Sequence, residues 1–203
     1  MLKPVMAGLV PLTLLATQPA AAAPEAYTLD SEHTHIVWRV DRFGFTETVG
    51  TFVELEGALH LDETDPASSS VSATIALSGL RSDLPQREEI VRGPYWLNAE
   101  SHPVIRFEST EVALTPGEDC PTQCAHVSGT LSLAGVSGPV TLKVTLNKIG
   151  TDPVTKKKAA GFSAAGQFDR SAFGIETALG PIGDTVRFEI EALAIAADDL
   201  PAQ

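Results

Sequence analysis

The sequence predicts an all-β domain, and three features of the chain after residue 33 support this prediction. Apolar and polar residues alternate with the two-residue period of half-buried strands. About eight such segments occur, and short clusters rich in Gly, Pro and Asp separate them. A single stretch breaks the alternation. A β-sandwich and a closed β-barrel both satisfy these features, because periodicity alone does not distinguish the two architectures.

Each strand is predicted from its own alternation. In the first, residues 34–41, Ile36, Trp38 and Val40 share one face, while Val37 and Arg39 share the other. The same pattern predicts strands at residues 51–61, 71–77, 104–114, 125–134, 140–149, 159–168 and 185–195. The exception is residues 84–98, where alternation stops after Ser82 and Asp83, two residue types that favour a helix start. A short helical insertion is predicted there.

The N-terminal segment has the features of a secretory signal peptide. Lys3 precedes an apolar core, residues 5–16, which is too short to span a bilayer and runs into four alanines at 20–23. Cleavage after Ala22 is predicted, which assigns residues 1–22 to a removed signal peptide and places the protein in the periplasm or outside the cell. Residues 23–203, about 180 residues, are predicted to form one domain, since they can bury a single sizeable core.

Composition excludes several classes of partner. The chain has 26 Asp and Glu against 14 Lys and Arg, a formal net charge of -12. Such a chain lacks the positive field that nucleic acid requires. Outside the signal, no apolar run approaches the roughly 20 residues of a membrane-spanning helix, so an integral membrane protein is not expected.

The two cysteines predict a disulfide. Cys120 and Cys124 are the only cysteines, and an exported chain with an even number of them usually pairs them. A zinc site would need a second pair of ligands. His33 and His35 could in principle ligate a metal, but a buried imidazole that hydrogen-bonds local backbone is the commoner arrangement. No metal site and no catalytic residue is predicted, since the sequence contains no recognised enzyme motif.

Several motifs resemble one family in their order and spacing over roughly 160 residues: residues 27–30, 43–45, 96–98, 102–103, 106–109, 139–142, 170–175 and 183–186. On these motifs the chain resembles the YceI-like family of exported proteins that bind polyisoprenoids. The resemblance implies an eight-stranded antiparallel lipocalin-like β-barrel with an elongated cavity. Two positions depart from the family pattern, Arg42 where His is frequent and Arg87-Glu88 where Arg-Asp is frequent.

The predicted function follows from the inward positions of such a barrel, which can be filled by side chains or can hold one small ligand. Small inward residues, including Ala73 and Gly166, leave room between the large ones. The resemblance implies a polyisoprenoid lipid or a quinone as ligand, with no other cofactor. The predicted ligand-binding residues, in the barrel interior and at its mouth, are Ile36, Trp38, Val40, Phe43, Phe45, Phe52, Ile75, Ile105, Phe107, Leu131, Leu142, Phe162, Ala164, Phe168, Phe173, Ile175 and Phe188.

Non-catalytic carriage of the lipid is the leading hypothesis. The alternatives are an accessory protein of periplasmic quinone-linked electron transfer and a stress-response protein whose barrel is filled by side chains. The sequence leaves monomer and homodimer both open.

Overall fold

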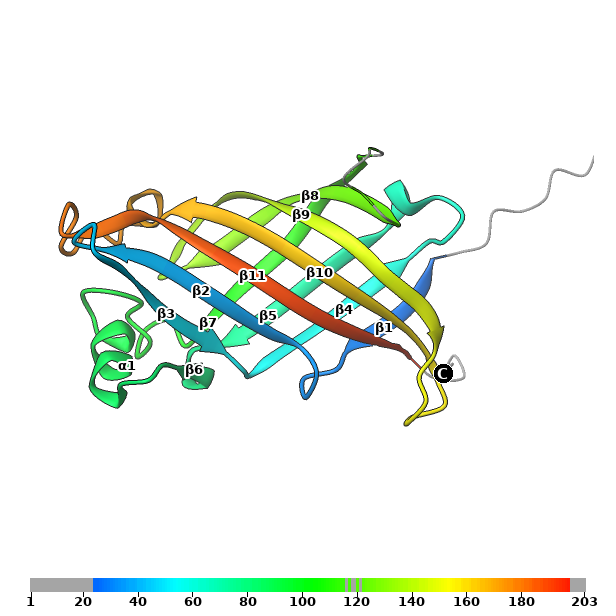
Figure 1. Ribbon diagram of the computed structural model, residues 1–203, viewed down its shortest axis with the longest axis horizontal. Coiled ribbons are helices and arrows are strands. Elements are labelled where there is room, and N and C mark those ends of the chain that lie inside the picture. Colours follow the sequence, from blue (N-terminus) through cyan, green and yellow to red (C-terminus); the bar gives the residue numbers. More distant parts are fainter. Residues whose placement is uncertain (1–23, 116, 118–119, 121, 198–203) are drawn as a thin grey trace, which may run out of the picture.

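The computed structural model describes residues 24–115, 117, 120 and 122–197 (Figure 1). The predicted signal peptide lies outside these residues. The strands are β1 (Glu25–Leu29), β2 (His35–Arg42), β3 (Thr46–Phe52), β4 (Leu55–Leu61), β5 (Ser70–Ala76), β6 (Leu80–Arg81), β7 (Val104–Leu114), β8 (Gln123–Leu133), β9 (Val136–Thr151), β10 (Lys158–Asp169) and β11 (Ile182–Ala196). The helix α1 spans Pro85–Arg92, and 3-10 turns span Pro66–Ser68, Leu77–Gly79 and Arg170–Phe173.

The strands close into an eight-stranded antiparallel barrel. The order is β1-β4-β5-β7-β8-β9-β10-β11, and β1 also pairs with β11, which completes the ring. Tyr27 of β1 lies opposite Leu59 on one side and Ala196 on the other. A closed ring leaves no free sheet edge between these strands. The predicted fold class, including the single helical insertion, is confirmed, and closure selects the barrel over the sandwich.

Three strands, β2, β3 and β6, lie outside this ring order. The short β6 pairs with the end of β3, and the other two share a place in the barrel wall with a neighbouring strand of the chain. The long β11 pairs with β1 near its C-terminal end and with β2 along the rest of its length, so β1 and β2 occupy one position in the barrel. In the same way β3 and β4 follow each other, with a bend at Val53 and Glu54. The N–H of Val53 bonds to Gly79 O, and Glu54 O accepts from Ala76, so this bend remains hydrogen-bonded.

The sequence-based elements differ from the structure in several places; for example, β6 was not predicted, and β9 begins at Val136 where residue 140 was predicted. The strand predicted at 51–61 is broken by the bend and begins earlier, because residues 46–50 pair with β2 although they are mostly polar. The strand β1 was not among the predicted strands. The helix ends at Arg92, and the rest of the predicted stretch to 98 consists largely of turns closed by backbone bonds, such as the bond from Leu97 N to Val91 O.

The elongated barrel has two distinct ends (Figure 1). At one end lie α1, the turn between β2 and β3, and the loop from Gly174 to Pro181; this is called the α1 end below. Contacts join these segments, since Thr177 Oγ1 donates to Tyr95 O at 2.6 Å and Phe43 N donates to Pro181 O at 2.7 Å. The strand β1 and the C-terminal end of β11 lie at the opposite end. No helix in the described part of the chain is long and apolar enough to cross a membrane.

Candidate functional site

The barrel interior encloses a cavity of about 480 Å³. This volume lies within the range of roughly 300 to 1,000 Å³ that small-molecule sites occupy. Side chains from β1 to β5, from β7 to β11 and from the segment that contains α1 line it. The lining is almost entirely aliphatic and aromatic, so the cavity suits an apolar ligand.

Fourteen of the seventeen predicted ligand-binding residues line this cavity. They are Ile36, Trp38, Val40, Phe52, Ile75, Ile105, Phe107, Leu131, Leu142, Phe162, Ala164, Phe168, Ile175 and Phe188. Strand periodicity therefore identified the inward face correctly on β2, β5, β7, β8, β9, β10 and β11. Contact of these residues with a ligand stays a prediction.

The other three predicted residues do not line the cavity. Phe43 and Phe45 are 51% and 88% exposed, because β2 ends at Arg42 and the chain turns outward. The turn is held by the Asp41 carboxylate, which accepts the N–H of Gly44 at 2.9 Å. Phe173 is buried outside the cavity in the 3-10 turn after β10, where its ring lies 5.2 Å from that of Phe168. The two turn phenylalanines therefore point into solvent, whereas Phe173 belongs to the same buried core cluster as Ile36 and Phe107. Contact of these three residues with a ligand stays a prediction.

Glycines keep the interior hollow by allowing large rings to lie against the wall. A Cβ built on Gly50 would come within 2.3 Å of Trp38 Cζ2, and one on Gly129 within 2.5 Å of Phe107 Cζ. These glycines belong to the strands next to the rings that cover them. Real Cβ atoms do not approach other atoms so closely. Each ring therefore lies in the space that the side chain of any residue other than glycine would need. The rings therefore take less of the cavity than rings directed toward the barrel axis would take.

Several lining residues were missed from the sequence. They include the apolar residues Leu29, Leu55, Leu59 and Leu61 of β1 and β4, the residues Ile90, Val91, Trp96 and Leu97 in and after α1, and the three arginines Arg42, Arg87 and Arg170. Arg42 carried a usable signal, because it continues the inward period of Ile36, Trp38 and Val40. The α1 residues carried none, since no strand period extends to them.

Arg170 is a buried cation whose hydrogen bonds go to backbone carbonyls. Only 3% of the residue is exposed, and its guanidinium donates to the O atoms of Ile175, Thr177, Ile182 and Gly183 at 2.8 to 3.0 Å. Its Cζ lies 5.1 Å from the ring centre of Trp96, a cation–π contact. Burial lowers the pKa of Arg170 from its ordinary value, against the nearby charge of Asp184, which raises it. These bonds fix the loop at the α1 end over the cavity.

Trp38 carries a buried donor without an acceptor. Its Nε1 has no hydrogen-bond partner among the described residues. An unpaired buried N–H costs about 1 to 3 kcal/mol. A ligand that placed an oxygen beside this nitrogen would recover part of that free energy.

The family model for the YceI-like domain matches residues 27–194 of this chain. The chain belongs to the YceI-like family. This assignment rests on nearly the whole barrel, from β1 to the end of β11.

Curated relatives support the family assignment. The chain is 34% identical over 173 residues to a UPF0312 protein of Enterobacter sp. strain 638, covering 85% of this chain and 86% of that protein. It is 32% identical over 187 residues to Protein YceI of an Escherichia coli strain, O17:K52:H18, covering 91% of this chain and 94% of that protein.

Solved structures of similar proteins support the YceI-like fold. BcnA of Burkholderia cenocepacia superposes with a TM-score of 0.71 at 21% identity, over 81% of this chain and 98% of that one. A protein from Saccharophagus degradans, described as a polyisoprenoid binding domain implicated in plant cell wall breakdown, superposes with a TM-score of 0.61 at 16% identity, over 85% and 99% of the two chains.

The disulfide predicted between Cys120 and Cys124 is present, with Cα atoms 5.9 Å apart. Cys124 lines the cavity at the end opposite α1, where it pairs with Thr145 of β9. The bond links the loop before β8 to the strand itself.

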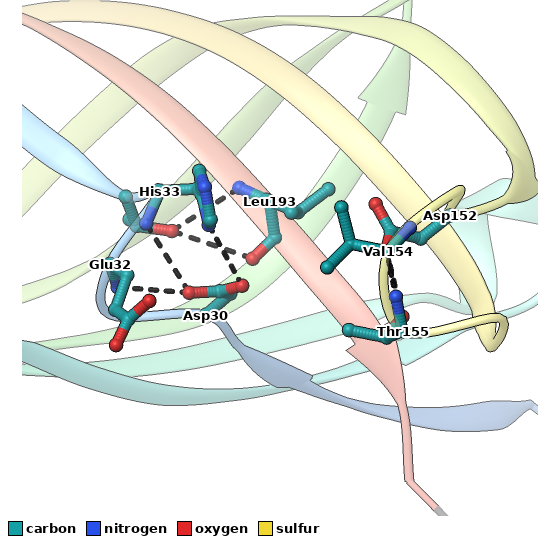
Figure 2. Close-up of polar contacts among 8 residues, drawn as sticks. Asp30, Glu32, His33, Asp152, Val154, Thr155 and Leu193 are labelled. Carbon is teal, nitrogen blue, oxygen red and sulfur yellow. Dashed lines mark hydrogen bonds and ion pairs between the residues drawn. The ribbon is translucent and has the colours of Figure 1, made fainter.

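The histidine predicted to be buried in this YceI-like chain is exposed instead. The side chain of His33 is 65% exposed, and its Nδ1 lies 3.1 Å from Asp30 Oδ2 (Figure 2). Burial raises the pKa of Asp30, but hydrogen bonds from His33 and from the N–H of Glu32 outweigh it and lower that pKa. The neighbouring turn is closed in a similar way, since the Asp152 carboxylate accepts the N–H groups of Val154 and Thr155 (Figure 2). Among the described residues, no group of three or more His, Cys, Asp and Glu could hold a metal.

Proposed function

We propose that this YceI-like barrel binds an isoprenoid lipid in its cavity and carries it in the periplasm without catalysing a reaction. The observation that carries the proposal is the apolar cavity of about 480 Å³ enclosed by the closed barrel. The neighbour from Saccharophagus degradans, described as a polyisoprenoid binding domain, supports the same class of ligand. The predicted signal peptide and the disulfide support export.

The dimensions of the cavity favour a long, thin ligand. On β11 the lining residues run from Ile182 to Ala192. With a rise of about 3.3 Å per residue and a tilt of about 40°, this wall extends roughly 25 Å along the barrel axis. A chain of several isoprene units matches a space of this length better than a compact ligand does.

The energetics of burial give a lower limit for the length of the tail. Each buried methylene-sized group contributes about 0.8 kcal/mol, so a five-carbon unit contributes about 4 kcal/mol. Association itself costs roughly 4 to 15 kcal/mol. A tail of about twenty carbons contributes about 16 kcal/mol on the same scale and therefore exceeds the cost.

Extraction of the purified protein tests the proposal. The full chain with its leader is expressed, the protein is purified from the periplasmic fraction, and organic extracts are analysed by mass spectrometry. We expect a lipid with a polyprenyl chain at close to one molecule per protein. A quinone in the extract would favour the accessory role in electron transfer, and an extract without lipid would count against carriage of a lipid.

A pair of variants on one strand shows whether the lipid lies inside the barrel. Ala164 lines the cavity, whereas its neighbour Ala165 on β10 is exposed on the outer face. Ala164→Trp places a ring in the cavity and should abolish copurification of the lipid, at a cost of about 1 to 3 kcal/mol in stability. Ala165→Trp should leave the lipid content unchanged. Equal lipid content in both folded variants would place the ligand outside the barrel.

A further inference from the structure

Large apolar side chains are exposed at the α1 end of the barrel (Figure 1). Ten such side chains are exposed among the described residues, and six of them belong to the segments that form this end. These six, called the apolar rim below, are Phe43, Phe45, Leu84, Ile90, Tyr95 and Leu179. Single exposed apolar residues are ordinary on a protein surface, whereas a group of them marks a site of contact. We propose that the apolar rim docks reversibly on the surface of a lipid membrane; this inference rests on the proposed function.

Hydrogen bonds hold the segments of the apolar rim together. The N–H of Phe43 donates to Pro181 O at 2.7 Å, which joins the turn between β2 and β3 to the loop that contains Leu179. Thr177 Oγ1 donates to Tyr95 O at 2.6 Å, which joins the same loop to the turns after α1. The side chains of the rim therefore project from one connected surface, so several of them can meet a membrane together.

The fold does not require the two phenylalanine rings of the rim. Phe45 is 88% exposed and Phe43 is 51% exposed, and neither packs against a buried cluster of the described residues. Phe43 also has a φ of +58°, in the left-handed region that bulky residues rarely adopt. Glycine or asparagine would occupy this position at a lower cost. Exposed rings that are kept in a strained turn indicate a role in binding.

The cavity identifies a membrane as the surface that the rim meets. Ile90 belongs both to the rim and to the cavity lining, although it is 54% exposed, so the cavity reaches the surface within the rim. Each methylene group of a lipid tail that is exposed to water lowers the population of that state about fourfold. A tail that passes directly from a membrane into the cavity avoids this penalty. A protein bound to the rim would supply no lipid at the opening.

The charge of the chain predicts which lipids suit the docking. A formal net charge of -12 repels an anionic surface, so the rim should bind through its apolar side chains. The competing surface is the turn between β9 and β10 at the opposite end, where Val154 is 85% exposed and Lys156 and Lys157 follow it. Docking through these lysines would need anionic lipid and would weaken with salt. Docking through the rim should occur on neutral phosphatidylcholine and should not depend on salt.

Vesicle flotation tests the docking. The purified protein and three variants, Phe45→Ser, Tyr95→Ser and Val154→Ser, are mixed with vesicles of phosphatidylcholine, alone or with phosphatidylglycerol. We expect Phe45→Ser to lower the partition onto phosphatidylcholine about tenfold, because the burial of a ring is lost. Tyr95→Ser should lower it about threefold, since the hydroxyl of Tyr95 prefers the wet interface. Val154→Ser is the control and should leave it unchanged. All three side chains are exposed, so the variants should keep the thermal midpoint of the parent.

Uptake of an isoprenoid separates docking from binding. Geranylgeraniol is offered either in vesicles or from solution, with tryptophan fluorescence as the readout, because Trp38 and Trp96 both line the cavity. Tyr95 does not line it. Tyr95→Ser should therefore slow uptake from vesicles about threefold and leave the affinity for geranylgeraniol from solution unchanged.

The outcomes separate the two proposals. If the parent does not float, or if Phe45→Ser floats like Val154→Ser, docking through the rim is refuted while lipid carriage stands. Flotation that requires phosphatidylglycerol and falls with salt would assign docking to the opposite end and overturn the inference. If geranylgeraniol from solution does not bind to the folded protein, carriage itself is refuted, and the docking falls with it. Loss of flotation and of uptake from vesicles in the rim variants alone supports the inference.

Discussion

Gly166→Ala should close part of the cavity without disturbing the backbone. A Cβ built on Gly166 of β10 would lie 2.6 Å from Phe188 Cζ and 3.1 Å from Leu142 Cδ2, and the nearest atoms are all side-chain atoms. Carbon atoms prefer separations of about 3.5 to 4.0 Å, so the Phe188 ring must move by roughly 1 Å. Both side chains line the cavity, and the ring moves into the open space.

The expected magnitude follows from two opposing contributions. Overpacking of a filled core costs about 1 to 3 kcal/mol, but the cavity accommodates the displaced ring and keeps the cost near the lower limit. Replacing Gly by Ala in a strand stabilises the folded state by about 0.5 to 1 kcal/mol, because it reduces the conformational entropy of the unfolded chain. We expect a net change in the free energy of unfolding within about 1 kcal/mol. The affinity for lipid should fall about four- to fifteenfold, as the tail loses one or two methylene contacts.

Gly161→Ala on the same strand is the control, because a Cβ there would meet no atom within 4 Å. Urea unfolding measures the stability of both variants, and fluorescence titration with an isoprenoid measures their affinity. Gly161→Ala should be as stable as the parent or slightly more so, with unchanged affinity. If Gly166→Ala gains stability like Gly161→Ala and binds lipid like the parent, the packing of aromatic rings against glycines does not control the cavity.

Three further predictions concern the fold. Replacing Cys120 and Cys124 by Ser should leave the barrel folded and lower its stability by at most about 2 kcal/mol in urea unfolding, because the disulfide closes a very short loop; a variant that fails to fold would refute this. Arg170→Leu should cost about 3 kcal/mol or more, since four carbonyls lose their donor, and a thermal midpoint equal to that of the parent would contradict the role given to Arg170. A hydrogen bond from Lys158 lowers the pKa of Glu25 below its ordinary 4.5. The ionised Glu25 therefore stabilises the fold fully above about pH 4.5, and this stabilisation is lost as the pH falls further. The urea midpoint of unfolding should drop on acidification, and it should drop less in Lys158→Met.

The strands could be predicted from the sequence wherever one face meets the cavity and the other meets water. Trp38 and Phe188, for example, each sit in a clear two-residue alternation, and the register places them opposite each other. The first half of β3 has no such contrast, since Thr46 and Glu47 are both exposed and polar, and it is held in the sheet by backbone pairing with β2. Backbone hydrogen bonds leave no trace in the order of side chains, so such a segment escapes a periodicity argument.

The candidate site was predictable on the strands and not at the α1 end. Ile90 and Trp96 reach the cavity because α1 and the turns after it fold over the opening, an arrangement set by tertiary bonds such as Thr177 to Tyr95. Phe43 and Phe45 resembled lining residues by type, but the turn after Arg42 carries them into solvent. Aromatic character alone did not distinguish the exposed Phe43 and Phe45 from the cavity-lining Trp96. Where such a residue lies depends on how the chain turns after a strand or a helix ends.

Whether the barrel is hollow or filled depends on which residues oppose each other across strands. The sequence contains both large rings and glycines, and this composition alone is compatible with a packed core. In the structure Gly50 lies opposite Trp38, and Gly166 lies opposite Phe188, so a ring and a glycine share each of these wall positions. A shift of the register by two residues would keep every inward face inward but would set Phe188 opposite Ala164 or Phe168 in place of Gly166. The rings would then lose the space beside the backbone and turn toward the barrel axis, which is why pairing register, more than composition, determines the cavity.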